Sequence, residues 1–130
     1  MKAAVRYFSR SGNTKAVAEA IAGAAGVRAI PVDAADAALD EPADVLFIGG
    51  ALYAYGLDRR LTDYLRTLKA DDAKKAVIFS TSWLSRHAVD LIRRGLTEAG
   101  IPAEEAYFYV KSRPDDAQLK EAAAFAEKFL

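Results

Sequence analysis

The run Asp44-Val45-Leu46-Phe47-Ile48-Gly49-Gly50 limits the possible folds more than any other stretch of the chain. After its first residue the run contains no polar side chain, and such an unbroken apolar run is typical of a strand buried on both faces. Strands of this kind lie in the centre of parallel sheets whose two faces are covered by helices. The run therefore predicts an α/β fold with this strand near the middle of the sheet.

Other segments alternate around this strand. Strand patterns occupy 3–8, 27–32, 76–81 and 105–110. Helical patterns occupy 13–25, 58–68, 85–99 and 115–129, and the Ala-rich piece 33–39 is expected to form a helical turn or two. Ser85 is the expected N-cap of the third long helix. This alternation predicts a three-layer sandwich with a five-stranded parallel sheet, and right-handed crossovers favour the strand order 2-1-3-4-5.

Composition excludes several classes of protein. The 130 residues suit a single domain over 1–130, and 52% hydrophobic with 28% charged residues indicates a globular chain. The formal net charge of zero gives no overall attraction to nucleic acid or to an acidic membrane. Without cysteine there is no disulfide or thiolate chemistry, and one histidine makes a metal site unexpected. No run approaches a membrane span and no signal peptide is evident, so we expect a cytoplasmic domain.

A polar loop stands where the first strand turns into the first helix. This first loop has the sequence Ser9-Arg10-Ser11-Gly12-Asn13-Thr14. A helix N-terminus has unpaired backbone N–H groups and a partial positive charge, which together bind anions and above all phosphate. The hydroxyl groups add donors, and Gly12 allows the backbone to approach a ligand closely. The alternative is that the loop is only a turn and an N-cap, since serine and asparagine are favoured at both.

Two further loops are expected at the same edge of the sheet. The second loop, 51–57, carries Tyr53 and Tyr55, and the third loop, 81–85, carries Trp83. In open parallel sheets ligands bind beyond the carboxyl ends of the strands, where the first and third strands diverge. An anion site beside two aromatic loops predicts a binding site for a flat ring that carries a phosphate. The alternative is that these aromatic residues belong to the core or its rim.

At this point the chain resembles the flavodoxins, which are small FMN-binding electron carriers, and the resemblance covers essentially the whole chain. The first loop fits the family's T/S-x-T/S-G-N-T phosphate motif at every defined position. The resemblance implies FMN as cofactor, with the phosphate held by the whole loop, Arg10 included. Its hydroxyl and amide ligands would be Ser9, Ser11, Asn13 and Thr14, and Gly12 would give a backbone N–H.

The same resemblance assigns the other two loops to the two sides of the isoalloxazine ring. One side corresponds to Ala51, Leu52, Tyr53, Ala54, Tyr55 and Gly56. The other corresponds to Thr81, Ser82, Trp83, Leu84 and Ser85, among which Trp83 is the residue expected to stack on the ring. The peptide that faces N5 of the ring in that family corresponds to Ala54 or Gly56.

Three functions are compatible with these features. The favoured one is a low-potential electron carrier between redox partner proteins. The alternative is an FMN-dependent oxidoreductase with its own small substrate, such as a quinone reductase or an enzyme like the flavodoxin-like protoporphyrinogen dehydrogenases, which the pair Tyr55-Gly56 resembles. A phosphoacceptor domain is disfavoured because the first strand does not end in acidic residues. No general acid or base stands out, and His87 is more consistent with an exposed helix residue than with a catalyst.

Arginines are concentrated around the three loops. They are Arg10, Arg59, Arg60 and Arg86, and Asp58 is the only acidic residue there. This pattern predicts a basic rim and a redox partner with an acidic docking face. The alternative is that the arginines point outward and pair with carboxylates of the helices, where they would contribute little.

Overall fold

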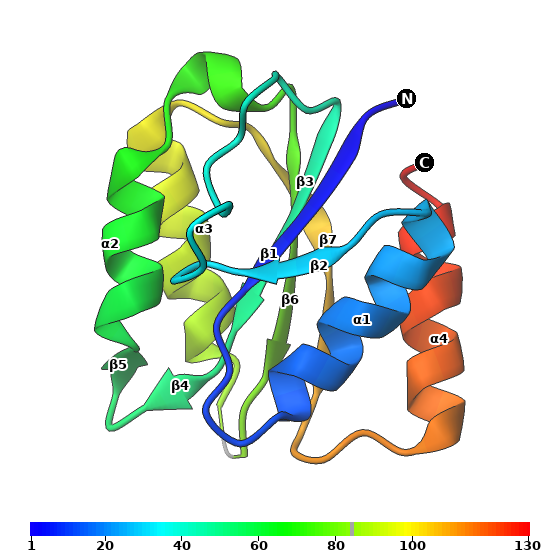
Figure 1. Cartoon of the computed structure of the whole chain (residues 1–130). Coiled ribbons are helices and arrows are strands. Elements are labelled where there is room, and N and C mark those ends of the chain that lie inside the picture. The colour runs from blue at the N-terminus through cyan, green and yellow to red at the C-terminus, as the bar shows by residue number, and fades with distance from the viewer. Residues whose placement is uncertain (84) are drawn as a thin grey trace.

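A computed structural model describes residues 1–83 and 85–130 and contains a five-stranded parallel sheet (Figure 1). The strands are β1 (Ala3–Tyr7), β2 (Ala29–Pro31), β3 (Val45–Gly50), β6 (Ala76–Thr81) and β7 (Ala103–Val110). They lie side by side in the order β2-β1-β3-β6-β7, and every neighbouring pair is parallel. β6 and β7 are the fourth and fifth strands of this sheet along the chain, because β4 and β5 form a separate small sheet. The observed order is therefore the predicted order 2-1-3-4-5, and the predicted topology is confirmed.

Four α-helices and one short 3₁₀ helix cover the sheet in the part of the chain just given. They are α1 (Asn13–Ala25), α2 (Arg59–Thr67), η1 (Ala70–Asp72), α3 (His87–Ala99) and α4 (Asp116–Glu127). α1 and α4 pack together on one face of the sheet, and α2 and α3 pack together on the other (Figure 1). The structure therefore has the three layers that the sequence predicted.

The central strand β3 joins the two halves of the core. Leu46 and Ile48 lie in the apolar cluster on the α2 and α3 side, whereas Val45 and Phe47 lie in the cluster on the α1 and α4 side. All four side chains are fully buried. Alternating side chains of one strand thus fill both cores, which explains the unbroken apolar run in the sequence.

The segment 33–39 forms isolated turns, so the predicted helical turns there are wrong. The backbone carbonyl of Ala37 accepts hydrogen bonds from two buried side chains of the sheet and of α2. Arg6 Nε and the Tyr64 hydroxyl each donate to it at 2.7 Å. These two side-chain donors use the carbonyl oxygen that a helix would pair with a backbone N–H four residues later. Side-chain hydrogen bonds, rather than a helix, therefore hold this segment against the sheet and α2.

Other boundaries also differ from the sequence prediction, and capping geometry explains two of them. The second strand begins at Ala29, because Gly26 ends α1 with φ 70° and Val27 N–H still bonds to the helix, to Ala22 O. Arg86 is the N-cap of α3, and Ser85 Oγ instead accepts a bond from His87 N at 3.0 Å. Local capping geometry decides both positions.

Gly49 of β3 provides a test of how tightly the sheet is packed. A Cβ at this position would lie 2.3 Å from two ring carbons of Phe79 and 2.5 Å from the Phe79 carbonyl oxygen. Because a backbone oxygen cannot move aside, Gly49→Ala should lower the free energy of unfolding by about 3 kcal/mol, the upper end for overpacking. Urea unfolding measures the change.

Gly23→Ala is the matched control, because this helical glycine has nothing within 4 Å of an added Cβ. It should raise the free energy of unfolding by about 0.5–1 kcal/mol through helix propensity. Equal effects of the two substitutions would contradict the packing that places β3 against β6.

Candidate functional site

The loops that follow β1, β3 and β6 meet at one edge of the sheet (Figure 1). Three hydrogen bonds join them. Thr14 Oγ1 lies 2.6 Å from Thr81 Oγ1, Leu52 N donates to Ser82 Oγ at 3.0 Å, and Arg10 N donates to Tyr53 Oη at 3.1 Å. Residues from all three predicted loops are therefore brought together, and the loops bond directly to one another.

The first loop leaves the start of α1 free of side-chain caps. Gly12 is the N-cap, with φ 94° in the left-handed region that favours glycine, and no side chain of the described chain caps this helix. α2 and α4, by contrast, are capped by Asp58 and Asp115. The serine and asparagine side chains of the loop therefore do not cap α1, and its first N–H groups are available to an anion.

The hydroxyl groups of the first loop differ in their surroundings. Ser9 Oγ accepts a bond from Gly12 N at 3.0 Å and so stabilises the turn. Thr14 is almost fully buried, with 1% of its surface exposed, and its hydroxyl pairs with Thr81. Ser11 is exposed and Asn13 is partly buried. Ser11 therefore has the most accessible hydroxyl next to the helix end.

The second loop contains a small hairpin that the sequence analysis did not anticipate. Strands β4 (Leu52–Tyr53) and β5 (Gly56–Leu57) pair antiparallel across Ala54 and Tyr55. Both turn residues have positive φ, 46° and 73°, which costs non-glycine residues about 1–3 kcal/mol each. The turn holds the Tyr55 side chain 92% exposed at the edge of the site. Ala-Tyr is not one of the residue pairs that favour hairpin turns, so no local pattern indicates this turn.

The third loop is anchored through Ser82 and exposes Trp83. Tyr109 donates its hydroxyl hydrogen to Ser82 O, and the Ser82 side chain accepts the bond from Leu52 N. Trp83 is 62% exposed, and Lys111 Nζ lies 5.0 Å from the centroid of its ring. Leu84, which the sequence analysis included in this loop, lies outside the described residues.

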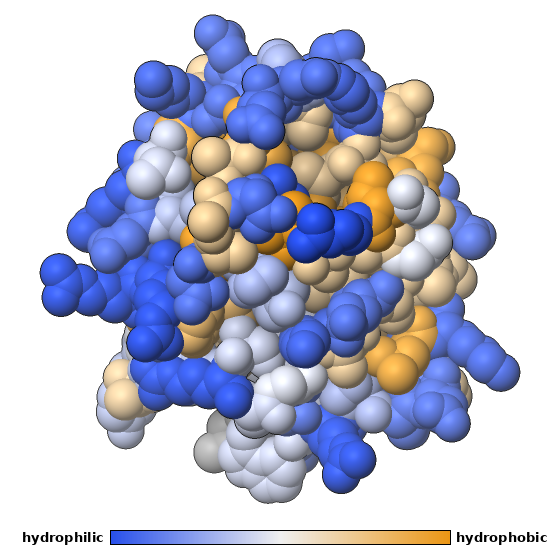
Figure 2. Space-filling view, in the orientation of Figure 1, coloured by the Kyte–Doolittle hydropathy of each residue, from blue (hydrophilic) through white to orange (hydrophobic). Residues whose placement is uncertain are grey.

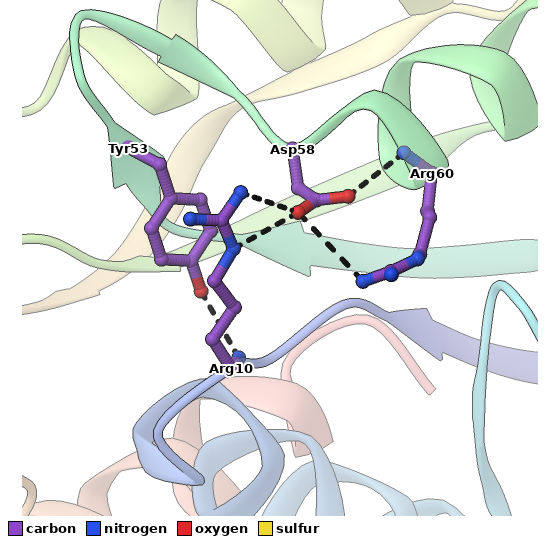
Figure 3. A network of polar contacts seen from close by, with 4 residues as sticks. All are labelled: Arg10, Tyr53, Asp58 and Arg60. Carbon is purple, nitrogen blue, oxygen red and sulfur yellow. Dashed lines mark hydrogen bonds and ion pairs between the residues drawn. The ribbon is translucent and has the colours of Figure 1, made fainter.

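A buried carboxylate, Asp58, connects the first loop to the start of α2 (Figure 3). Its Oδ2 accepts bonds from Arg10 Nε at 3.0 Å and Nη2 at 2.7 Å, and its Oδ1 accepts one from Arg60 N at 2.9 Å. The Arg10 guanidinium also lies over the Tyr53 ring, 4.0 Å from its centroid. An Asp directly before a helix is a local sequence signal for its capping role. Its pairing with Arg10 has no such signal, because the two residues are far apart in sequence.

The charge state of Asp58 follows from these contacts. Burial alone would raise the pKa of this carboxyl group. The hydrogen bonds from Arg60 N–H and the Arg10 side chain, together with the two positive charges, outweigh burial and lower the pKa below its ordinary value of 3.8. Asp58 is therefore ionised at neutral pH and offsets part of the arginine charge beside the first loop.

Not all the arginines of the predicted basic rim face the site. Arg59 pairs with Asp63 of its own helix at 3.7 Å, as the alternative prediction had it, and Arg86 lies over the ring of Tyr109. Arg10 and Arg60 line a hollow of about 650 Å³, together with Lys15 and the first loop. Figure 2 shows strongly hydrophilic side chains gathered at the end of α2 that adjoins the hairpin.

Other kinds of site find little support in the described chain. Residues 1–83 and 85–130 contain no group of three or more Asp, Glu or His side chains that could hold a metal ion. His87 is exposed, and its Nδ1 lies 3.9 Å from Asp90 on the same helix. Over the same residues, none of the helices combines the length and the apolar character needed to cross a membrane.

The chain matches a protein-family model and several solved structures of known proteins. The family model described as "Flavodoxin domain" matches residues 4–119. The chain is similar to oxidised Flavodoxin 1 from Bacillus cereus, with a TM-score of 0.82 and 22% identity, over 99% of this chain and 97% of that one. It is also similar to a flavodoxin from the domain Archaea, with a TM-score of 0.74 and 26% identity, over 99% of this chain and 96% of that one. The fold is therefore flavodoxin-like.

A larger protein contains the same architecture as one part. In rubredoxin oxygen:oxidoreductase from Desulfovibrio gigas the match has a TM-score of 0.83 and 17% identity, and it covers 98% of this chain but 35% of that one. No curated protein matches the chain in sequence.

The lowered pKa of Asp58 predicts how stability changes in acid. A carboxyl group whose pKa is lower in the folded state stabilises the fold above its unfolded pKa and loses this effect as the pH falls through its folded pKa. At pH 7 Asp58→Asn should therefore be less stable by about 1.5–3 kcal/mol, the range for hydrogen bonds to a charged group. Below pH 4 the difference should shrink, as measured by urea unfolding from pH 7 to pH 2.5.

Asp63→Asn controls for the loss of one negative charge, because Asp63 is exposed and lies on the same helix. An Asp58→Asn deficit that stayed constant down to pH 2.5 would mean that the ionised Asp58 carboxylate does not stabilise the fold.

Proposed function

The chain belongs to the flavodoxin domain family, and we propose that it binds FMN and carries electrons at low potential between redox partner proteins. The observation that carries this proposal is the uncapped start of α1, at a sheet edge where the second and third loops each expose an aromatic side chain, Tyr55 and Trp83. FMN would supply a ring that accepts and releases electrons, and the residues around it would set its position and accessibility.

The donors of the first loop suit a phosphate monoester. The first backbone N–H groups of α1 and the exposed hydroxyl of Ser11 would bind its oxygens, and the left-handed Gly12 shapes the turn around them. Thr14 is a predicted phosphate ligand through its backbone N–H, or through its hydroxyl once that donates to phosphate and accepts from Thr81. Ser9 would maintain the turn. This donor set is chemically what a dianionic phosphate needs.

The ring of FMN would lie between the second and third loops. Tyr55 and Trp83 are large aromatic side chains with exposed surfaces, 92% and 62%, and they suit stacking on the two sides of a flat ring. Tyr53 is less available, because Arg10 already covers one face of its ring. Ala54 and Gly56 remain the predicted neighbours of flavin N5.

An accessible ring favours an electron carrier over an enzyme with an enclosed substrate pocket. The hairpin and the third loop lie at the surface, so a partner protein could approach the flavin closely. We propose a cytoplasmic location as part of the same function, since a small domain built without cysteine suits a reducing compartment.

The charges at the rim support a partner with an acidic docking face. Arg10, Arg60 and Lys15 line the hollow beside the first loop, and Lys111 lies next to Trp83. The lining also contains Asp33, while Asp58 is enclosed between the two arginines. Opposite charge on a partner would accelerate association, and salt would weaken the effect.

Ser11→Ala tests phosphate binding by the first loop. Removing one hydrogen bond to a charged group should weaken FMN binding by about 1.5–3 kcal/mol. Riboflavin lacks the phosphate, so its affinity should stay nearly constant, and fluorescence titration measures both dissociation constants. Ser112→Ala, on a segment after β7, is the control. An equal loss for both flavins would place the phosphate elsewhere.

The carrier function predicts electron exchange that depends on charge. The reduced FMN-loaded protein should pass electrons to an acidic redox protein faster at low salt than at high salt, as followed by stopped-flow absorbance. K15Q/R60Q should slow this transfer and flatten its salt dependence, because both residues line the hollow beside the first loop, whereas Arg28→Gln, an exposed residue before β2, should not. Rapid turnover of a quinone or a protoporphyrinogen by the protein alone would instead establish the alternative, an FMN-dependent oxidoreductase.

A further inference from the structure

We propose that Asp58 controls how strongly the site selects for the phosphate of its ligand, because it pairs with the Arg10 guanidinium and holds it on the Tyr53 ring. The inference rests on the proposed flavin site. In this proposal Asp58 is a positioning residue that acts through Arg10. Arg10 is a side chain able to bind phosphate, but in the observed structure it is paired with Asp58.

The contacts of Arg10 show how firmly it is held. Nε and Nη2 both bond to one oxygen of Asp58, and the guanidinium stacks on the Tyr53 ring while Arg10 N bonds to the Tyr53 hydroxyl (Figure 3). The Asp58 side chain is 7% exposed and the Arg10 side chain 55%. Releasing Arg10 would leave the buried carboxylate with weaker compensation, so the pair is favoured over a free arginine.

Arg10 is nevertheless well placed to reach a phosphate. It stands between Ser9 and Ser11 in the first loop, and its side chain lines the same hollow as Ser9, Ser11 and Gly12. Guanidinium groups bind phosphate through two parallel, charge-assisted hydrogen bonds. A released Arg10 would add a full positive charge to a set of donors that otherwise consists of hydroxyl and backbone N–H groups.

Asp58→Asn separates the two roles of Asp58, which are to cap α2 and to hold Arg10 by its negative charge. Asparagine has nearly the same size and keeps an oxygen that can accept the bond from Arg60 N, so the cap of α2 is retained. It removes the negative charge that competes with phosphate for Arg10. The ratio of the riboflavin dissociation constant to the FMN dissociation constant should therefore rise about tenfold, the effect of one charge-assisted bond.

The experiment is a double-mutant cycle with the native chain, D58N, R10Q and R10Q/D58N. Fluorescence titrations give the dissociation constants of FMN and riboflavin at low and high salt. We expect the higher ratio in D58N, a steeper salt dependence of FMN binding, and the native ratio again in R10Q/D58N. A purely structural role of Asp58 would weaken both flavins by the same factor and leave the ratio unchanged, which would overturn the proposal.

Two further outcomes are informative. If the higher ratio persisted in R10Q/D58N, the added charge would come from another residue such as Arg60, and the assignment to Arg10 would be wrong. Asp58→Glu keeps the negative charge and should stay close to the native ratio. A tenfold increase in this variant would contradict the role of charge.

Inorganic phosphate distinguishes failure of this inference from failure of the proposed function. Phosphate binding to the ligand-free protein, followed through the amide NMR signal of Gly12, should be tighter in D58N even if neither flavin binds the native chain. Should D58N not fold, Asp58→Ser keeps a capping oxygen without the charge and should show the same tighter binding. Unchanged phosphate affinity in a folded variant without the charge would reject the inference.

Discussion

The parallel direction of β1, β3 and β6 is the constraint on which the rest of the structure depends. It brings the carboxyl ends of three strands to one edge, so that loops far apart in sequence become neighbours (Figure 1). Burial of β3 on both faces fixes the strands on either side of it, and Gly49 leaves room for Phe79 of the adjacent strand. The position of the site is therefore a consequence of the same packing that stabilises the fold.

At this edge of the sheet the partial charges of a helix end lie near a small cluster of full charges, in which one carboxylate stands between two arginines. The uncapped end of α1 presents backbone N–H dipoles, which can bind an anion without a charged lysine or arginine side chain. Asp58 shares its charge between Arg10 and Arg60 and keeps both beside the first loop. In our proposal the anion site and the arginines therefore depend on each other, because the carboxylate that orients the arginines would also limit their attraction for a phosphate.

Much of the fold could be predicted from the sequence, because long apolar runs and helical spacing are local signals. The bounds of α1 and β6 and the strand order agree with the prediction. The hairpin at Ala54 and Tyr55 could not be predicted, since its positive φ angles occur in residues without turn preference. The pairing of Arg10 with Asp58 and the anchoring of Ala37 by Arg6 join distant parts of the chain, and such contacts leave no periodic pattern.

The most direct test of the central claim, that the three loops form one FMN site, is a titration of the ligand-free protein with FMN. Visible absorbance and the emission of Trp83, the only tryptophan, are followed together. The proposed FMN site predicts saturation at one FMN per chain, with shifted flavin bands and nearly complete loss of Trp83 emission. Free-flavin bands together with undiminished Trp83 emission, at FMN concentrations well above those of the protein, would contradict it.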